Sequence, residues 1–117
     1  AEAAGAGAEV AAVLDWELAT LGDPTADLAY ACLPYHLPPG FPQLGGLAGG
    51  PPPEGVPGEE EFVRSYCALA GRDGGVRDWH FYMAFAFFRV AAILEGVRAR
   101  ALRGNASSDR AAEVGRL

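Results

Sequence analysis

The sequence predicts an α+β fold that is mostly helical, with one short β segment near its beginning. Three observations support this prediction: a continuous apolar run at residues 10–14, an aspartate–proline pair at residues 23–24, and a long stretch of apolar residues at helical spacing between residues 79 and 97. Because the chain has 117 residues and is 50% hydrophobic, it can bury one core and no more.

The first expected element is a buried strand formed by the apolar run VAAVL at residues 10–14. The strand would stop at Asp15, so the carboxylates of Asp15 and Glu17 would project beyond its carboxyl end. Acids at such a junction are candidates for a functional site, although acids at a strand end are more often solvated turn residues. From these residues alone, both interpretations stay open.

A helix is expected to begin at Asp23 and Pro24. An aspartate N-cap accepts hydrogen bonds from free backbone N–H groups, and proline at the first helical position sacrifices no hydrogen bond. Asp27 lies one turn later, where the helix dipole favours a negative charge.

Residues 34–58 are rich in proline and glycine, which predicts an irregular surface loop. The glycines are not a phosphate cradle, because Gly49 and Gly50 run into three prolines and no lysine follows. A lid or substrate loop is the functional alternative, and a plain linker is the commoner one.

Two further helices are expected. The first begins at Glu59–Glu61, buries one face and ends at Gly71; its glutamates are more often a solvated helix start than a metal cluster. The second is capped by Asp78 and runs to about Arg103, and a short last helix is expected at residues 110–117.

The long helix carries two neighbouring apolar stripes, and we expect both to fill a core because large aromatic residues at helical spacing usually do. A pocket for an acyl or aromatic ligand is the alternative. The stripes are Trp79, Met83, Ala86, Val90, Ile93 and Val97, and Phe81, Phe85, Phe88 and Ala92.

Arg89 lies on a narrow polar edge of the same helix, where we expect an internal ion pair with an acid of residues 15–27; direct contact with substrate or phosphate is the alternative.

Composition excludes several classes of function. A net charge of −6 with scattered arginines argues against nucleic-acid binding. The apolar region 81–94 is shorter than the roughly 20 residues that span a bilayer and contains Arg89, so no membrane span is expected. Cys32 and Cys67 lack metal-ligand spacing and are expected to be buried and reduced, which favours an intracellular location, the cytoplasm if the protein is bacterial.

The run VLDWELATLGDPTADLAY at residues 13–30 resembles the metal-binding segment of the aminoglycoside phosphotransferase family of small-molecule kinases. The resemblance is to the branch related to acyl-CoA dehydrogenase family members 10 and 11. It continues through CLPYHLP, EEEFVRSYCALAGR and DWHFYMAFAFFRVAAILEGVRARALRGNASS, so it covers most of the chain from Glu9 onward. The order of several blocks makes it much more specific than the short DxE pattern alone.

The resemblance implies a kinase-like C-terminal-lobe fragment with a metal-binding segment and helix at 9–37, a loop at 38–58 and a helical subdomain at 59–117. Asp15 would correspond to the aspartate that binds Mg²⁺ bridging the phosphates of ATP, with Glu17 as a second candidate ligand. Asp27, together with Asp23, would support the catalytic loop. The implied partners are ATP and a small substrate with a hydroxyl group, such as a hydroxyacyl thioester, and a fused acyl-CoA dehydrogenase domain is a further expectation.

Several parts of the kinase machinery are missing from the sequence. The family's catalytic loop has a pattern like H-G-D-x-x-x-x-N, yet neither His36 nor His80 is followed by Gly-Asp, and the chain contains no lysine. We therefore expect a C-terminal portion that cannot transfer phosphate alone. The alternative is a non-catalytic helical interaction module or a degenerate kinase lobe, whose acids serve only as caps.

Overall fold

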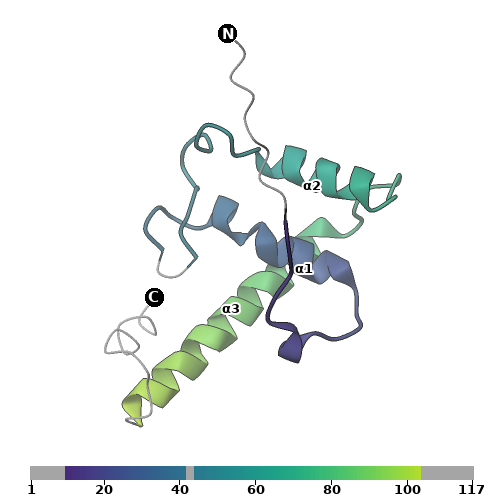
Figure 1. Cartoon of the computed structure of the whole chain (residues 1–117). Helices are drawn as coiled ribbons and strands as arrows, with labels where there is room; N and C mark the ends of the chain where they lie inside the picture. The colour runs from purple at the N-terminus through teal and green to yellow at the C-terminus, as the bar shows by residue number, and fades with distance from the viewer. Residues whose placement is uncertain (1–9, 42–43, 104–117) are drawn as a thin grey trace.

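The computed structural model describes residues 10–41 and 44–103, which form helices and connecting loops. Helix α1 (Pro24–Ala31) and the 3₁₀ helix η2 (Leu33–His36) pack across the first half of α3 (Trp79–Leu102) (Figure 1). Helix α2 (Glu59–Leu69) precedes α3 in the chain, and a short 3₁₀ helix η1 (Trp16–Leu18) precedes α1. The predicted predominance of helices is confirmed, whereas the β part of the predicted α+β class is not found among residues 10–41 and 44–103.

The start of α1 confirms the local prediction. Asp23 has an extended backbone, its carboxylate accepts a hydrogen bond from the N–H of Thr25 at 2.9 Å, and Pro24 occupies the first helical turn. Thr25 itself is buried, with 3% of its surface exposed. The N-terminus of α1 is therefore fixed by its own capping residue.

The core lies where α1 and η2 meet α3. Ala29 and Ala86 are both fully buried, which lets the two helices approach closely, and Cys32 and Leu33 fill the space beside them. Cys67 on α2 is also buried, and neither cysteine forms a disulfide. The expectation that both cysteines are buried is thus confirmed. The other members of this core are Leu37, Met83 and Val90.

Helix α2 ends as its sequence predicts. Gly71 has φ of +65°, and the N–H of Arg72 donates to the carbonyl of Cys67 at 2.8 Å. These are the features of a Schellman motif, in which a glycine in the left-handed region closes the last turn. Phe62 and Val63 face the core from α2.

Residues 34–36, the start of the predicted irregular loop, are helical because they belong to η2, and the later part of the proline- and glycine-rich segment folds back on η2. The N–H of Leu47 donates to the carbonyl of Pro34 at 2.7 Å, and the N–H of Ala48 donates to that of Leu37 at 3.0 Å. A Cβ atom on Gly46 would overlap with the carbonyl oxygens of Pro38 and Leu37. This close approach of two backbone segments requires glycine at residue 46.

The predicted strand at residues 10–14 is wrong. These residues have no regular secondary structure, and Val10, Val13 and Leu14 expose 85%, 63% and 81% of their surface. A strand requires a neighbouring strand to pair its N–H and C=O groups, and the described part of the chain offers none.

The second apolar stripe of α3 is not buried, contrary to our expectation. Phe81, Phe85 and Phe88 expose 66%, 41% and 69% of their surface, while Met83, Ala86 and Val90 form the core face. The cause is that α1 and η2 cover only one side of α3.

Among the described residues, α3 is the one helix whose length and composition would suffice to cross a membrane. The predicted last helix at 110–117 lies outside the described residues.

The contact at Gly46 leads to a stability prediction. Replacing Gly46 with alanine should destabilise the fold by about 1–3 kcal/mol, because the new methyl group would push the loop away from η2. The midpoint of urea unfolding, followed by circular dichroism, measures this loss. Gly50→Ala is the matched control in the same loop, since its Cβ would meet no atom within 4 Å. Equal midpoints for the two variants would contradict the packing described here.

Candidate functional site

Asp15 adopts a backbone conformation that is unusual for a non-glycine residue. Its φ and ψ are +67° and +49°, in the left-handed region, where a non-glycine residue costs roughly 1–2 kcal/mol. The indole N–H of Trp16 donates to the carbonyl of Val13 at 2.7 Å, which closes the turn around Asp15. The Asp15 side chain makes no capping hydrogen bond to η1. The turn therefore holds an exposed carboxylate that has no structural partner in η1.

Asp15 and Glu17 do not form a metal site by themselves. Glu17 lies in η1 and is exposed, and the described residues contain no group of three or more His, Cys, Asp or Glu side chains that could hold a metal ion. Magnesium, however, usually takes one or two protein carboxylates and fills its remaining positions with phosphate oxygens and water. One exposed carboxylate fits that kind of site and does not fit an all-protein metal cage.

Asp27 forms an ion pair with Arg89 of α3. One carboxylate oxygen lies 3.5 Å from a guanidinium nitrogen, and the two side chains expose 83% and 43% of their surface. The guanidinium also lies over the ring of Tyr30, 4.8 Å from its centre. The pair joins α3 to an acid of residues 15–27, but it is partly exposed instead of internal. An exposed pair contributes at most about 1 kcal/mol, so Asp27 remains available to another partner.

Asp23 is the centre of a hydrogen-bond network that the sequence did not reveal. Its second carboxylate oxygen accepts a hydrogen bond from the hydroxyl of Tyr82 at 2.5 Å, and Arg72 lies 4.0 Å from the first. Arg72 also donates to the hydroxyl of Thr25 at 2.8 Å. Tyr82 and Arg72 lie 59 and 47 residues from their partners. No short-range sequence signal could have paired them.

This network changes the acidity of both partners. The hydrogen bond from Tyr82, and then the one from the Thr25 N–H, lower the pKa of Asp23 from 3.8 to about 2. The same bond raises the pKa of Tyr82, because the hydroxyl proton is held by a carboxylate. Asp23 is therefore a charged anchor that ties the start of α1 to the first turn of α3.

An open cleft of about 630 Å³ lies beside this anchor. It is formed by the beginning of α1, the turn after α2 and the beginning of α3, and its lining is mostly polar. The residues that line it are Asp23, Thr25, Arg72, Gly75, Val76, Arg77, Asp78 and Tyr82.

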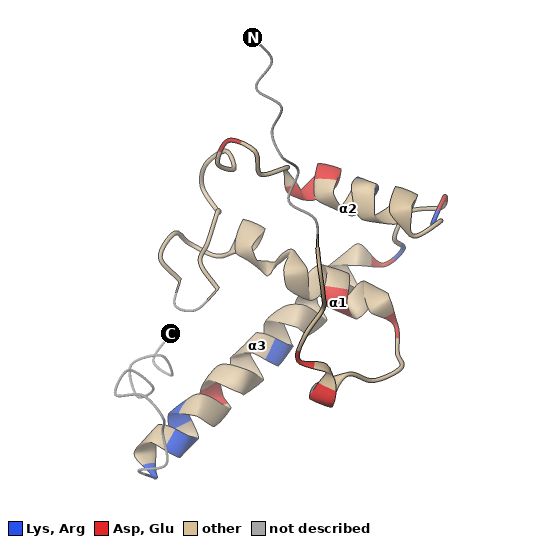
Figure 2. Ribbon diagram, viewed as in Figure 1, with Lys and Arg blue, Asp and Glu red and all other residues tan. Residues whose placement is uncertain are grey.

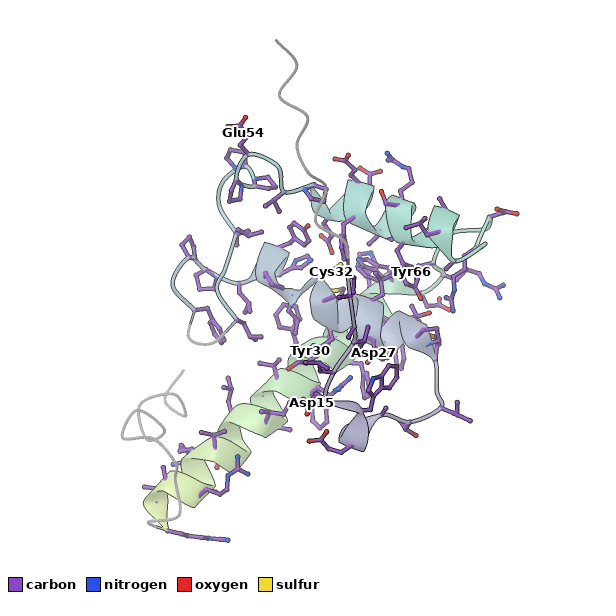
Figure 3. The ribbon with its side chains drawn as sticks, in the orientation of Figure 1. Asp15, Asp27, Tyr30, Cys32, Glu54 and Tyr66 are labelled. Atoms are coloured by element: carbon purple, nitrogen blue, oxygen red, sulfur yellow. The ribbon has the colours of Figure 1, made fainter. Side chains whose placement is uncertain are left out.

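The structure brings together only part of the predicted site. Asp27 meets Arg89, and Asp23 meets Tyr82, but none of the ion pairs between described residues includes Asp15 or Glu17. Figure 3 labels Asp15 and Asp27 in the region of the view where α1 crosses α3. In chemical terms the region offers two exposed acids, Asp15 and Glu17, that form no ion pair with another described residue, and two acids, Asp23 and Asp27, that join α1 to the elements around it.

A model of a family described as "Phosphotransferase enzyme family" matches residues 4–85 of the chain. No solved structure matches this chain. The matched residues include the Asp15 turn, α1 and the first part of α3.

The curated relatives are named as acyl-CoA dehydrogenases. Acyl-CoA dehydrogenase family member 10 of Mus musculus is 55% identical over 111 residues, which are 94% of this chain and 10% of that protein. Family member 11 of the same species is 43% identical over 86% of this chain, and a probable acyl-CoA dehydrogenase of Arabidopsis thaliana is 40% identical over 91%. In each of these last two proteins the match covers 13% of the length. The chain thus spans about a tenth of the relatives that it matches.

The network around Asp23 leads to a prediction about pH. Because the pKa of Asp23 is lowered on folding, its ionised form stabilises the protein fully above about pH 4, and this contribution is lost as the pH falls toward 2. Tyr82→Phe removes the largest cause, so the pKa of Asp23 should rise toward 3.8. A titration of the carboxyl ¹³C signal measures it. Tyr66→Phe is the control, because Tyr66 is no partner of Asp23; an unchanged titration in Tyr82→Phe would refute the assignment.

Proposed function

The chain belongs to the phosphotransferase enzyme family, and on this premise we propose that it supplies the Mg²⁺-binding aspartate, Asp15, of an ATP-dependent small-molecule kinase. The parent reaction would move the γ-phosphoryl group of ATP to a hydroxyl group of the substrate. Bound Mg²⁺ would neutralise charge on the phosphate oxygens, as in other kinases.

The turn at Asp15 is the observation that carries this proposal. Asp15 and Asp78 are the two non-glycine residues with positive φ among the described residues, and strained backbone of this kind is often found at functional sites. Its carboxylate does not cap η1, so a structural role there does not explain the conformation. A metal ion that also binds phosphate oxygens gives this exposed carboxylate a function.

We assign Asp27 and Asp23 a supporting role. Asp27 is 83% exposed, and its ion pair with Arg89 leaves carboxylate lone pairs free to accept backbone N–H groups of a catalytic loop. Asp23 fixes the start of α1 through Tyr82 and thereby fixes the position of Asp27 one turn later. Neither acid would contact the reacting atoms.

The chain by itself has an incomplete set of catalytic groups. It contains no lysine to bind phosphate and no H-G-D-x-x-x-x-N sequence to provide the base aspartate and the metal-binding asparagine. In the proposed kinase these groups would come from a longer polypeptide. That proposal agrees with the small part of each relative that the chain matches.

For the acceptor we propose a hydroxylated acyl thioester. The support is the name of the relatives, which are acyl-CoA dehydrogenase family members, and the same names support a fused dehydrogenase domain in the complete protein. Family membership alone does not determine the substrate.

For the location we propose the inside of the cell, because both cysteines are free and buried.

A non-catalytic helical module is the second candidate function. It is favoured by the absence, among the described residues, of any acidic or histidine cluster that could hold a metal. In such a module Asp15 would only terminate the segment before η1. The two candidates differ in what the loss of the Asp15 carboxylate does to nucleotide binding.

In the complete polypeptide that carries this segment, Asp15→Asn should lower kcat for phosphoryl transfer at least about 100-fold. This corresponds to about 2.7 kcal/mol of transition-state stabilisation. Mg²⁺-dependent ATP binding, measured by calorimetry, should weaken in the same variant. Glu54→Gln is the control, because it removes one charge from an exposed residue of the proline-rich loop. Equal MgATP affinity in wild type and Asp15→Asn would favour the non-catalytic module.

The 117-residue chain alone should not hydrolyse ATP or transfer its phosphate. A coupled assay with purified chain and Mg²⁺ checks this prediction, with any activity compared between wild type and Asp15→Asn. Turnover that is lost in Asp15→Asn would show that the missing lysine and catalytic loop are not essential. It would therefore contradict the assignment of those roles to a longer polypeptide.

A further inference from the structure

The side chain of Trp16 reaches back across Asp15, its neighbour in the chain. Its indole N–H donates a hydrogen bond of 2.7 Å to the carbonyl of Val13, three residues earlier. On the other side of Asp15, the Trp16 carbonyl accepts a hydrogen bond of 2.9 Å from the N–H of Ala19, which closes η1. The backbone of Asp15 is thus held between a side-chain bond before it and a main-chain bond after it.

The carboxylate of Asp15 takes no part in this arrangement. It makes no capping hydrogen bond to η1, and none of the ion pairs between described residues includes it. Residues 10–31 contain acidic residues but neither arginine nor lysine, so no basic neighbour within this segment holds the carboxylate (Figure 2). The turn therefore fixes the backbone of Asp15 without using the oxygen atoms that a metal ion would bind.

The indole ring is suited to this task because its N–H is a donor only. It binds the Val13 carbonyl and cannot accept a hydrogen bond from a competing backbone N–H. A phenylalanine ring, by contrast, has no donor. The Val13 carbonyl has two lone pairs, so it can keep the indole bond even where another part of a longer polypeptide pairs with residues 10–14. The bond lies within four residues and does not depend on what covers this segment.

A second aspartate–tryptophan pair in the chain provides an internal comparison. Asp78 also has a left-handed backbone, with φ of +55°, and its side chain makes no capping hydrogen bond at the start of α3. Trp79, however, packs its ring against the core. The same two residue types thus use the tryptophan for packing at α3 and for a hydrogen bond to the backbone at η1.

We propose that Trp16 is a positioning residue for the metal-binding carboxylate of Asp15. Its indole N–H keeps Asp15 in the left-handed region, and this conformation sets the direction in which the carboxylate leaves the backbone. Trp16 acts through Asp15 and contacts neither the metal nor the nucleotide. This role rests on the proposed function of Asp15 as a ligand of Mg²⁺.

The size of the effect follows from the energetics of the turn. The cost of a left-handed non-glycine residue is similar to the net contribution of one hydrogen bond. Loss of the indole bond should therefore lower the ratio of left-handed to extended Asp15 roughly fivefold. The dissociation constant for MgATP scales inversely with the competent fraction, so it should rise roughly two- to fivefold.

Nuclear magnetic resonance of the 117-residue chain tests the structural step without any metal. Residual dipolar couplings of the N–H and Cα–Hα bonds report the φ of Asp15. In Trp16→Phe these couplings should depart from the left-handed values, whereas in Trp79→Phe, the control at the second pair, they should not. Circular dichroism verifies that both variants keep their helices. Asp15 couplings that are the same in wild type and Trp16→Phe would overturn the proposal.

Calorimetry on the complete polypeptide tests the functional step. Trp16→Phe should raise the dissociation constant for ATP in the presence of Mg²⁺ roughly two- to fivefold. The dissociation constant for ATP in EDTA should stay unchanged, because the indole acts only through the metal ligand. An equal loss of affinity with and without Mg²⁺ would indicate a merely structural role and refute the positioning role.

Asp15→Asn separates this proposal from the one on which it rests. If Asp15→Asn leaves the affinity for MgATP unchanged, the metal assignment itself is wrong and Trp16 has nothing to position. If Asp15→Asn weakens MgATP binding and Trp16→Phe does not, Asp15 remains the metal ligand and only the role of Trp16 is refuted. In the double variant, Trp16→Phe should add no further loss to that of Asp15→Asn, because its effect passes through the same carboxylate.

Discussion

The close contact between α1 and α3 is the interaction on which the rest of the structure depends. Ala29 and Ala86 have no exposed surface, so the two helices meet through small side chains with Cys32 and Leu33 beside them. The buried core is small, and it involves only one face of each helix. The positions of Asp23 and Asp27 follow from this contact, since both acids are attached to α1.

The polar network at the start of α1 complements the apolar contact. Asp23 accepts hydrogen bonds from its own helix and from Tyr82 on α3, while Arg72 approaches from the turn after α2. Three segments that are far apart in sequence are thus joined at one carboxylate. The apolar core sets the distance between α1 and α3, and the Asp23 network fixes the rotation of α1 relative to that core.

The sequence predicted most of the elements whose signals are local, although the side chain of Asp78 makes no capping hydrogen bond at the start of α3, contrary to expectation. Asp23 and Pro24 marked the start of α1, and Gly71 marked the end of α2, because caps act over three or four residues. The prediction of a strand at 10–14 is wrong because strand formation depends on a partner strand that can lie far away in the sequence. The predicted burial of the Phe81 stripe is wrong for a related reason. Periodicity shows which face of a helix is apolar, but it gives no information about what covers that face. The Tyr82 and Arg72 contacts are long-range as well, and no local pattern encodes them.

Both incorrect predictions concern apolar residues that are exposed in the structure. One exposed apolar segment consists of Val10, Val13 and Leu14, and a second exposed apolar surface is the Phe81, Phe85 and Phe88 stripe of α3. Covering either from water would be favourable in free energy. The segment at 10–14 leads directly into Asp15, whose left-handed backbone costs free energy that no capping hydrogen bond of its side chain offsets. The hydrogen bond from Trp16 to Val13 preserves this turn even where the preceding residues are unpaired. The conformation of Asp15 is therefore encoded within a few residues, so the turn can form without the segments that pack around α1.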